Sequence, residues 1–376
     1  MSIKCKAAVL HEIGLKKPYK VSVPLKIEEV EIEAPGPEEV LVKIQAAGIC
    51  HSDLSVINGD RPRPVPMALG HEGSGIIKEV GNKVKNFEVG DHVVFIFVPP
   101  CGSCLDCKEG KPALCASGLV SNTAGTLLSG NRKIKLNGDY INHHVGVSCF
   151  SEYAVVSKRS IVKIDKNISF EEAALFGCAI ITGAGAVFNT AKIRPGSTVA
   201  VIGLGGTGMA ALLGAKAAGA SQIIGVDLVD EKLKLAKKLG ADLVINPNTE
   251  EKINDIIAIC NGGVDYSFEC VGSVNTMELG YKLIKRGGML ISSGLSHPSK
   301  SFSIQHVDLV TGEKTIKGSF LGSCIPDRDI PSYIQMYKKG IFPINNIMSN
   351  FIKLESINES LDLLEEGKTV RQIIKF

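Results

Sequence analysis

Hydrophobic residues follow two patterns along this chain, and one gives way to the other near residue 180. In the first part, short apolar stretches are separated by Gly, Pro and Asp, which are typical turn residues. The predicted strands there include Val40–Ala46, Gly75–Val80 and His92–Phe97. The pattern therefore predicts a β-rich region over roughly the first 150 residues.

After residue 180, apolar stretches alternate with segments of helical character. The predicted strands are Thr198–Ile202, Gln222–Val226, Leu243–Ile245, Asp265–Phe268, Met289–Ser292 and Thr315–Gly318, with helices at Met209–Ala220 and Glu231–Leu239. Strands interleaved with helices are typical of an α/β fold with a doubly wound parallel sheet, here of six strands. A helix at Ser356–Leu364 and a strand at Arg371–Phe376 are predicted to end the chain.

Length, composition and charge set limits on the kind of protein. A chain of 376 residues is long for one hydrophobic core, so we expect two domains. The net charge of +3, from 42 basic and 39 acidic side chains, gives no reason to expect nucleic acid or a membrane as partner. The N-terminal stretch lacks the apolar segment of a secretion signal, and no apolar run reaches the ~18 residues of a membrane span. We therefore expect a cytoplasmic protein.

Four of the eleven cysteines lie in one short stretch with the spacing C-x2-C-x2-C-x7-C: Cys101, Cys104, Cys107 and Cys115. Four thiolates suit tetrahedral Zn²⁺, and such a closed site holds a loop rather than doing chemistry. Two disulfides and an iron–sulfur cluster are the alternatives. The spacing would strain the disulfides, and nothing in the chain indicates an oxidising compartment. We predict a structural zinc.

A second motif follows the predicted strand Thr198–Ile202. The run Gly203, Leu204, Gly205, Gly206, Thr207, Gly208 matches G-x-G-x-x-G and leads into a helix, the context in which this loop binds a dinucleotide pyrophosphate. Asp227 ends the next strand, where a carboxylate accepts hydrogen bonds from the adenosine ribose and repels a 2′-phosphate. Because Leu228 rather than Arg comes next, we predict NAD rather than NADP. A structural turn in an unrelated α/β sheet is the alternative.

A third group of residues is scattered but suited to chemistry: Cys50-His51-Ser52-Asp53, Gly70-His71-Glu72 and Gly177-Cys178. Two thiolates and an imidazole would form a Cys₂His zinc site with its fourth position open. Zinc in such a site polarises an oxygen and lowers its pKa, which activates an alcohol. Taken singly, each residue is more often a packing residue, so the prediction rests on the combination.

Together these motifs resemble the zinc-dependent medium-chain alcohol dehydrogenases over nearly the whole chain, and Cys₂His is the catalytic ligand set of that enzyme. His143–Phe150 and the C-terminal strand resemble the long-lobed, dimeric branch. The resemblance implies a GroES-like catalytic domain over 1–179 and 322–376, with a structural zinc lobe at about 99–116, and a Rossmann NAD-binding domain over 180–321. It also implies two zinc ions per chain and a homodimer, with a tetramer as the alternative.

The resemblance also implies roles for individual residues. Cys50, His71 and Cys178 would ligate catalytic zinc, Ser52 would receive the substrate proton, Asp53 would orient His71, and Glu72 would lie behind the metal. His51 and Arg371 would lie near the pyrophosphate, and Lys232 near the adenosine ribose. Phe97, His144, Val145 and Leu295 would line the substrate pocket.

The chain departs from this family in three places. Ser55 stands where dimeric members often carry a relay His, and His144 is polar where the family is usually apolar. The glutathione-dependent formaldehyde dehydrogenases carry an Arg shortly after the fourth lobe cysteine, but Ala116–Val120 has no basic residue; Arg61 or Arg132 could stand in.

These observations predict reversible oxidation of a primary or aryl alcohol to an aldehyde, with hydride passing to NAD. One alternative is a formaldehyde dehydrogenase acting on a thiol adduct, such as S-hydroxymethylglutathione. A weaker alternative is a zinc- and NAD-binding redox sensor without turnover.

Overall fold

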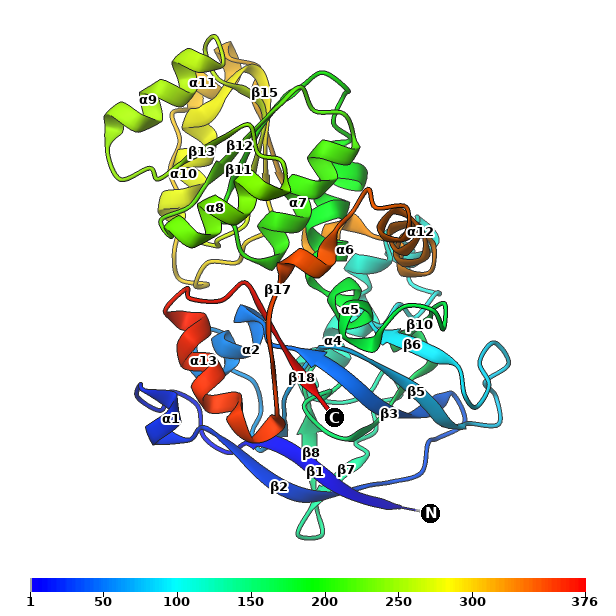
Figure 1. The fold of residues 1–376 in the computed structure, drawn as a ribbon. Helices are drawn as coiled ribbons and strands as arrows, with labels where there is room; N and C mark the ends of the chain where they lie inside the picture. Colours follow the sequence, from blue (N-terminus) through cyan, green and yellow to red (C-terminus); the bar gives the residue numbers. More distant parts are fainter. Residues whose placement is uncertain (1) are drawn as a thin grey trace. The chain divides into compact units, whose positions relative to one another are not determined.

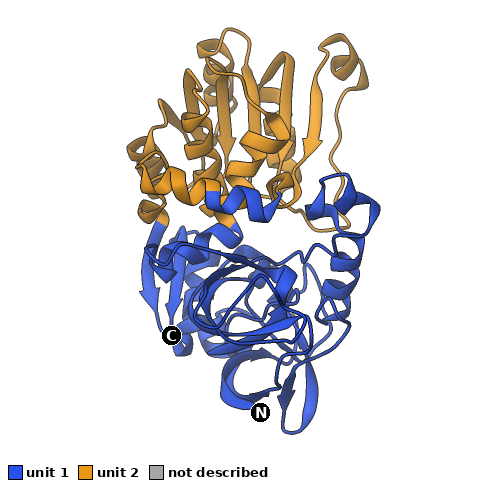
Figure 2. Cartoon of the chain, turned by 90° about the vertical axis from the view of Figure 1, so that its right-hand side faces the viewer, with its two compact units in different colours: residues 1–178, 325–331, 348–376 blue, residues 179–324, 332–347 orange. Residues whose placement is uncertain are grey.

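The computed structural model describes residues 2–376 (Figure 1). The chain forms two compact units, coloured separately in Figure 2. Unit 1 comprises the residues up to Cys178 together with Ile325–Pro331 and Met348–Phe376, and unit 2 comprises Ala179–Cys324 and Ser332–Ile347. Among the described residues, no single helix has the length and apolarity to cross a membrane, although one bent pair, Phe170–Gly177 with Ala179–Ala191, passes by length and composition.

The assignment of residues near the C-terminus differs from the predicted domain boundaries. Residues 322–376 were predicted to belong to the catalytic domain, but 322–324 and Ser332–Ile347 belong to unit 2, as does Ala179. Aromatic packing explains this difference. The ring of Tyr333 lies 5.8 Å from that of Phe188 and 6.3 Å from that of Phe342, centroid to centroid. Buried aromatic pairs of this kind contribute more than their area alone.

Unit 1 contains a closed barrel of five strands in the order β1-β2-β7-β8-β4. Their bounds are β1 Ile3–Leu10, β2 Leu25–Ile32, β4 Met67–Ala68, β7 Ile134–Leu136 and β8 Asp139–His143. Strand β2 reads Leu-Lys-Ile-Glu-Glu-Val-Glu-Ile, so polar residues interrupt its apolar ones. Val30 and Ile32 of this strand are buried in a core with Ala7 and Val9 of β1. Figure 1 shows β1 and β2 running side by side.

A second sheet of unit 1 has the order β10-β6-β5-β3-β18-β17, with β9 also paired to β3. The bounds are β3 Glu39–Gly48, β5 Glu72–Val80, β6 His92–Phe95, β9 Tyr153–Ser157, β10 Ile161–Lys163, β17 Met348–Ile352 and β18 Arg371–Lys375. Glu72 pairs with Gly48 at the end of β3, and Ile373 of β18 pairs with Gly48 from the other side. This register brings the starts of β5 and β18 to the end of β3.

Short helices connect the strands of unit 1. They are α1 Tyr19–Ser22, α2 His51–Ile57, α3 Leu105–Lys108, η1 Pro112–Leu114, α4 Ala116–Ala124, η2 Lys158–Ser160, α5 Phe170–Ala174, η3 Leu175–Gly177, η7 Leu354–Ser356 and α13 Ile357–Glu365. The predicted C-terminal helix and strand correspond to α13 and β18, each shifted by a residue or shortened at its end. Leu361 and Leu364 of α13 are buried in the core of this unit.

Unit 2 is built on the predicted six-stranded parallel sheet, in the order β13-β12-β11-β14-β15-β16. Its strands are β11 Thr198–Ile202, β12 Gln222–Val226, β13 Leu243–Ile245, β14 Val264–Glu269, β15 Ile284–Ser292 and β16 Thr315–Gly318. The order reverses direction between β11 and β14. In doubly wound sheets this reversal marks the edge where ligands bind.

The other elements of unit 2 are mainly helices. They are α6 Ala179–Gly185, η4 Ala186–Ala191, α7 Gly206–Ala217, α8 Asp230–Leu239, α9 Glu250–Ile259, α10 Val274–Leu283, α11 His306–Thr311, η5 Phe320–Ser323 and η6 Ile344–Ile347, while α12 Pro326–Lys338 runs through both units. Helix α7 begins three residues earlier than predicted and ends three residues earlier. Its first turn uses Gly206 and Gly208, residues that sequence reasoning does not place inside a helix.

Candidate metal centres and dinucleotide site

The junction between β3 and α2 positions the first candidate ligand of the predicted catalytic zinc. Cys50 caps α2, and its N–H donates to Asp53 Oδ2 at 3.1 Å. The other carboxylate oxygen of Asp53, Oδ1, lies 2.8 Å from Nδ1 of His71. Asp53 is fully buried. One carboxylate therefore fixes both the helix that begins after Cys50 and the orientation of the His71 ring, with Nε2 left for a metal.

Cys178 joins this group from the end of η3. Its thiol, the Cys50 thiol, a ring nitrogen of His71 and a carboxylate oxygen of Glu72 all lie within 4.8 Å of one another. All four residues are buried. His71 Nε2 and both oxygens of Glu72 have no hydrogen-bond partner in the described residues. Buried polar atoms without partners are costly, and a zinc ion bound by two thiolates and an imidazole would satisfy His71 Nε2.

Charges inside the cluster favour the metal-binding form of Cys50, whereas they raise the pKa values of His71 and Cys178. A hydrogen bond from the Cys178 thiol lowers the pKa of Cys50 well below its usual range, and the positive charge of Arg371 acts in the same direction. Burial raises the pKa of Glu72 to about 7. For His71, burial disfavours the charged ring, but the attraction of Asp53 outweighs it and raises the pKa. Cys50 is therefore poised as a thiolate, the form that binds metal.

Arg371 lies within this cluster of unit 1. Its Nη1 donates to the carbonyl oxygen of Ile49 at 3.0 Å, and its Nη2 lies 3.5 Å from Glu72 Oε2. The side chain is 4% exposed. In this structure Arg371 partly compensates the buried carboxylate of Glu72. Its predicted place near the pyrophosphate stays a prediction.

Three of the four predicted pocket residues lie in unit 1. The rings of Phe97 and His144 each meet His71 edge to face, at centroid distances of 5.4 and 5.5 Å. His144 Nδ1 lies 3.4 Å from Asp53 Oδ1, and burial followed by repulsion from His71 lowers the pKa of His144 well below its usual value. Val145 is buried next to His144. Leu295 is 50% exposed and lies after β15 in unit 2.

The two serines of α2 differ in their surroundings. Ser52 is half-buried, one helical turn before Ser55, and its role as proton acceptor stays a prediction. Ser55 is buried and donates its hydroxyl proton to the carbonyl oxygen of His51 at 2.9 Å. Bonding to the residue four positions earlier is common for serine in helices. Ser55 is therefore committed to its helix, and His51 is an exposed residue at the helix start.

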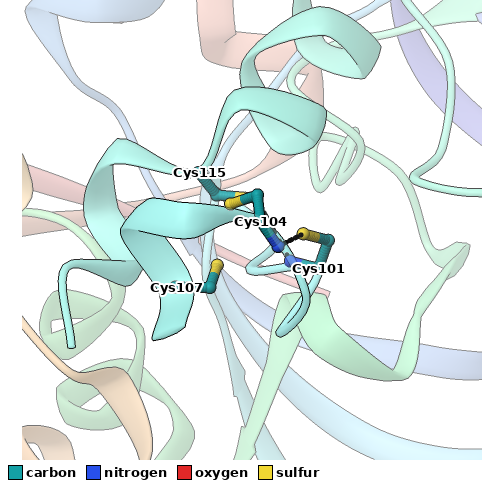
Figure 3. A group of neighbouring side chains, drawn as sticks. All are labelled: Cys101, Cys104, Cys107 and Cys115. Carbon is teal, nitrogen blue, oxygen red and sulfur yellow. Dashed lines mark hydrogen bonds between the residues drawn. The ribbon is translucent and has the colours of Figure 1, made fainter. Parts of the chain in front are cut away.

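The four lobe cysteines come together as the spacing predicts (Figure 3). Their sulfur atoms lie within 4.8 Å of one another. Backbone N–H groups point at two of them: Ser103 and Cys104 donate to Cys101, and Cys101 and Gly118 donate to Cys115. All eleven cysteines are free thiols in the structure. This arrangement fits a Cys₄ zinc site and does not contain the disulfides considered as an alternative.

The glycine-rich loop of unit 2 has the geometry of a phosphate cradle. A Cβ on Gly208 would lie 1.7 Å from the carbonyl oxygen of Gly203, whereas one on Gly205 would meet nothing within 4 Å. Gly208 therefore allows the loop to fold back tightly, and open space lies beside Gly205 where the loop enters α7. The free N–H groups at this helix start favour an anion.

Asp227 lies at the end of β12 beside this loop. Its Oδ2 accepts from the N–H of Leu204 at 2.7 Å, and its Oδ1 accepts from Val229 at 2.9 Å. These bonds fix the carboxylate relative to the loop. Lys232, half-buried in the first turn of α8, follows shortly after. This arrangement fits recognition of the adenosine ribose.

Sequence reasoning missed one buried carboxylate at the same sheet edge. Glu269 ends β14; its Oε1 accepts from Val271, Gly272 and Thr276, and its Oε2 accepts from Ser292 at 2.8 Å. The residue is fully buried. It ties together the turns that follow β14 and β15. The sequence carried one signal for this residue, because Glu269 is an acidic residue at the carboxyl end of a predicted parallel strand.

Comparison with known proteins extends the resemblance to the full chain. Residues 36–166 match the model of the alcohol dehydrogenase GroES-like domain, and residues 206–339 match that of the zinc-binding dehydrogenase family. The chain is 39% identical to alcohol dehydrogenase class-3 of Drosophila melanogaster, covering 100% of this chain and 98% of that protein. It is 37% identical to S-(hydroxymethyl)glutathione dehydrogenase of a Synechocystis strain, covering 100% of both.

Among solved structures, the benzyl alcohol dehydrogenase of Acinetobacter calcoaceticus has a TM-score of 0.92 and 35% identity, covering 100% of this chain and 99% of that one. An alcohol dehydrogenase zinc-binding domain protein from Burkholderia ambifaria has a TM-score of 0.94 and 33% identity, covering 100% of both chains.

Proposed function

Because this chain belongs to the zinc-dependent medium-chain alcohol dehydrogenase family, we propose that it oxidises the hydroxymethyl group of a thiol–formaldehyde adduct with NAD. The family assignment confirms the predicted fold class, oxidoreductase class and zinc and dinucleotide cofactors. The finer choice of substrate differs from the predicted primary or aryl alcohol. Two relatives that match the whole chain carry the names of class-3 alcohol dehydrogenase and S-(hydroxymethyl)glutathione dehydrogenase, and this supports the adduct.

Within the site, Cys50, His71 and Cys178 would hold the catalytic zinc, with Asp53 holding His71 in the metal-binding orientation. Bound zinc would polarise the hydroxyl oxygen and favour loss of its proton. Ser52 would accept that proton and pass it toward solvent. The carbon-bound hydrogen would leave as hydride to the nicotinamide, so that NAD is reduced and the adduct becomes a thioester.

Residues of unit 2 would determine which dinucleotide is bound. Asp227 presents a fixed carboxylate beside the glycine-rich loop, and a 2′-phosphate placed there would meet like charge. We therefore propose NAD over NADP, with two zinc ions per chain. The four-cysteine lobe would hold the second ion and maintain the fold rather than take part in the reaction.

A second candidate function has support of its own. The likeness to benzyl alcohol dehydrogenase, at 35% identity over the whole chain, favours an aryl alcohol. The missing basic residue in Ala116–Val120 points the same way unless another cation replaces it. Oxidation of an aryl alcohol would use the same zinc ligands and the same proton acceptor. The two candidate functions therefore differ only in how the part of the substrate beyond its hydroxyl group is bound.

NADH absorbance distinguishes these functions. The zinc-loaded protein would be incubated with NAD and either formaldehyde, formaldehyde with glutathione, or benzyl alcohol. We expect NADH from formaldehyde only when glutathione is present, with a higher kcat/KM than for benzyl alcohol. Turnover of benzyl alcohol with none of the adduct would favour the aryl alcohol function. Binding of zinc and NAD with no turnover of any alcohol would favour the redox sensor.

A further inference from the structure

Glu269 ends β14 in unit 2, and no step of the proposed reaction uses it. We infer that Glu269 is a positioning residue for the dinucleotide: it fixes two turns at the carboxyl edge of the parallel sheet against the glycine-rich loop and thereby sets the affinity for NAD. The inference goes beyond the proposed function, because it concerns how the dinucleotide is held and applies whichever alcohol is oxidised.

The carboxylate of Glu269 accepts four hydrogen bonds from three segments of the chain. Its Oε1 accepts from the N–H groups of Val271 at 2.8 Å and Gly272 at 2.6 Å, in the turn after β14. The same oxygen accepts from the hydroxyl of Thr276 at 2.8 Å, in the first turn of α10. Its Oε2 accepts from the hydroxyl of Ser292 at 2.8 Å, at the end of β15. Because the side chain is fully buried, it can act on a ligand only through the segments that it joins.

The turns that follow β14 and β15 touch each other backbone to backbone. A Cβ on Gly272 would lie 2.5 Å from the backbone nitrogen of Leu295, and one on Gly294 would lie 2.1 Å from the backbone nitrogen of Gly272. The carbonyl oxygen of Glu269 also accepts from the N–H groups of Ser293 and Gly294, at 2.9 and 3.3 Å. Since no side chain fits between the two turns, the position of one determines the position of the other.

The turn after β14 also lies against the glycine-rich loop. A Cβ on Gly203 would lie 2.4 Å from Cγ2 of Val271. The N–H of Cys270 donates to the carbonyl oxygen of Ile202 at 2.9 Å, which joins this turn to the end of β11. The contacts therefore run from Glu269 through Val271 to the first glycine of the loop. Strand order reverses between β11 and β14, and ligands of doubly wound sheets bind at this edge.

Each of the two turns carries an exposed apolar side chain. Val271 is 53% exposed and Leu295 is 50% exposed. Apolar surface beside a few fixed polar groups is typical of small-molecule sites, and it suits the flat rings of a dinucleotide. Burial of a carboxylate is costly, whereas apolar packing would join two turns without that cost. The geometry that Glu269 fixes, rather than stability alone, therefore accounts for a carboxylate at this position.

Calorimetric titration of the full-length, zinc-loaded protein with NAD tests this role. We expect Glu269→Ala to raise the dissociation constant for NAD about tenfold to a hundredfold, because a hydrogen bond to a charged group contributes a factor of about this size. Glu269→Gln should change it only about threefold or less, the size of one neutral hydrogen bond. The amide oxygen can keep the three donors of Oε1, and the amide N–H can donate to the hydroxyl oxygen of Ser292. An unchanged dissociation constant in Glu269→Ala would overturn the inference.

Asp265 provides a matched control at the other end of the same strand. Its Oδ2 accepts from the N–H and from the hydroxyl of Thr198, both at 2.8 Å, and its Oδ1 lies 2.7 Å from Nζ of Lys285. Asp265→Ala should therefore lower the free energy of unfolding without changing the affinity for NAD. An equal loss of NAD affinity in Asp265→Ala and Glu269→Ala would mean that general destabilisation explains the effect, and it would also overturn the inference.

Cofactor selectivity supplies a readout that distinguishes Glu269 from Asp227. Glu269→Ala should weaken NAD and NADP by the same factor and leave the ratio of their dissociation constants unchanged, whereas Asp227→Ser should change that ratio. A changed ratio in Glu269→Ala would contradict a role through the turns. Should Glu269→Ala fail to fold, as judged by circular dichroism, Ser292→Ala removes only the donor to Oε2. It should raise the dissociation constant for NAD about threefold to tenfold, and an unchanged value would refute the role.

The outcomes for Glu269 and for the proposed reaction are separable. Wild-type and variant proteins that show the expected NAD affinities but do not oxidise the glutathione adduct would refute the proposed function and leave the role of Glu269 standing. Oxidation of the adduct by Glu269→Ala with the wild-type KM and dissociation constant for NAD would do the opposite.

Discussion

Replacing Asp53 with Asn should selectively weaken the catalytic metal site. Both carboxylate oxygens accept hydrogen bonds, one from His71 Nδ1 at 2.8 Å and the other from the Cys50 N–H at 3.1 Å. Asparagine has the same shape but only one acceptor. If its oxygen faces His71, its amino group meets the Cys50 N–H. If its oxygen faces Cys50, its amino group meets the proton on Nδ1, and His71 can relieve this only by moving the proton to the nitrogen that a metal needs.

The size of the effect follows from these contacts. Loss of a hydrogen bond that orients a metal-bound histidine usually costs about 10- to 100-fold in metal affinity, which is about 1.4–2.7 kcal/mol. One buried donor left without an acceptor costs about 1–3 kcal/mol, so two independent considerations give the same range. We therefore expect Asp53→Asn to lower the affinity for one of two zinc ions by this factor and to lower kcat/KM with it.

Zinc competition with a chelator, followed by metal analysis, measures this affinity. Asp91→Asn is a matched control, because Asp91 is also buried, accepts from the N–H of Glu88 at 3.0 Å and pairs with Lys163 at 2.7 Å. It should lower the free energy of unfolding without changing zinc affinity. Asp53→Asn protein that retains both zinc ions as tightly as wild type would refute the role assigned to the carboxylate.

Three further predictions concern other parts of the site. Cys104→Ser should reduce folding or solubility first, whereas Cys178→Ser should abolish activity with the fold kept. Thermal unfolding and zinc content distinguish the two variants. One zinc ion per active wild-type chain would contradict both expectations. Asp227→Ser should weaken the binding of NAD and allow NADP to be used, and kcat/KM for each cofactor measures both effects. Equal kcat/KM values for NAD and NADP in the wild type would refute the role of Asp227. Ser52→Ala should lower kcat on the order of 100-fold and Ser55→Ala little, so near-normal kcat without the Ser52 hydroxyl would defeat the proposed proton path.

The central strands of the parallel sheet could be predicted closely from sequence because they are buried on both faces. Thr198–Ile202 and Gln222–Val226 are continuous apolar runs bounded by polar or glycine residues, and the structure gives both the predicted bounds. The barrel strands were not predicted individually. In Leu25–Ile32, exposed Lys26 and Glu29 interrupt the apolar residues, so the strand has no continuous apolar run. The prediction of a β-rich region was therefore correct without its strand pairings.

The site shows the same division between local and long-range information. The sequence alone indicated the four lobe cysteines because their spacing confines them to one lobe. The contact of Arg371 with Glu72 depends on β18 and β5 lying on either side of β3, which no local pattern encodes. The contact of Arg63 with Thr123 of α4 likewise joins residues 60 positions apart in the sequence.

Helix and strand ends carry the ligands of the proposed catalytic zinc. Cys50 caps a helix, His71 immediately precedes β5, and Cys178 follows η3. The metal ligands alone therefore do not specify the alcohol in this fold. Relatives of similar identity that are named for different alcohols are expected on this basis, and the substrate of each must be inferred from its loops rather than from its metal ligands.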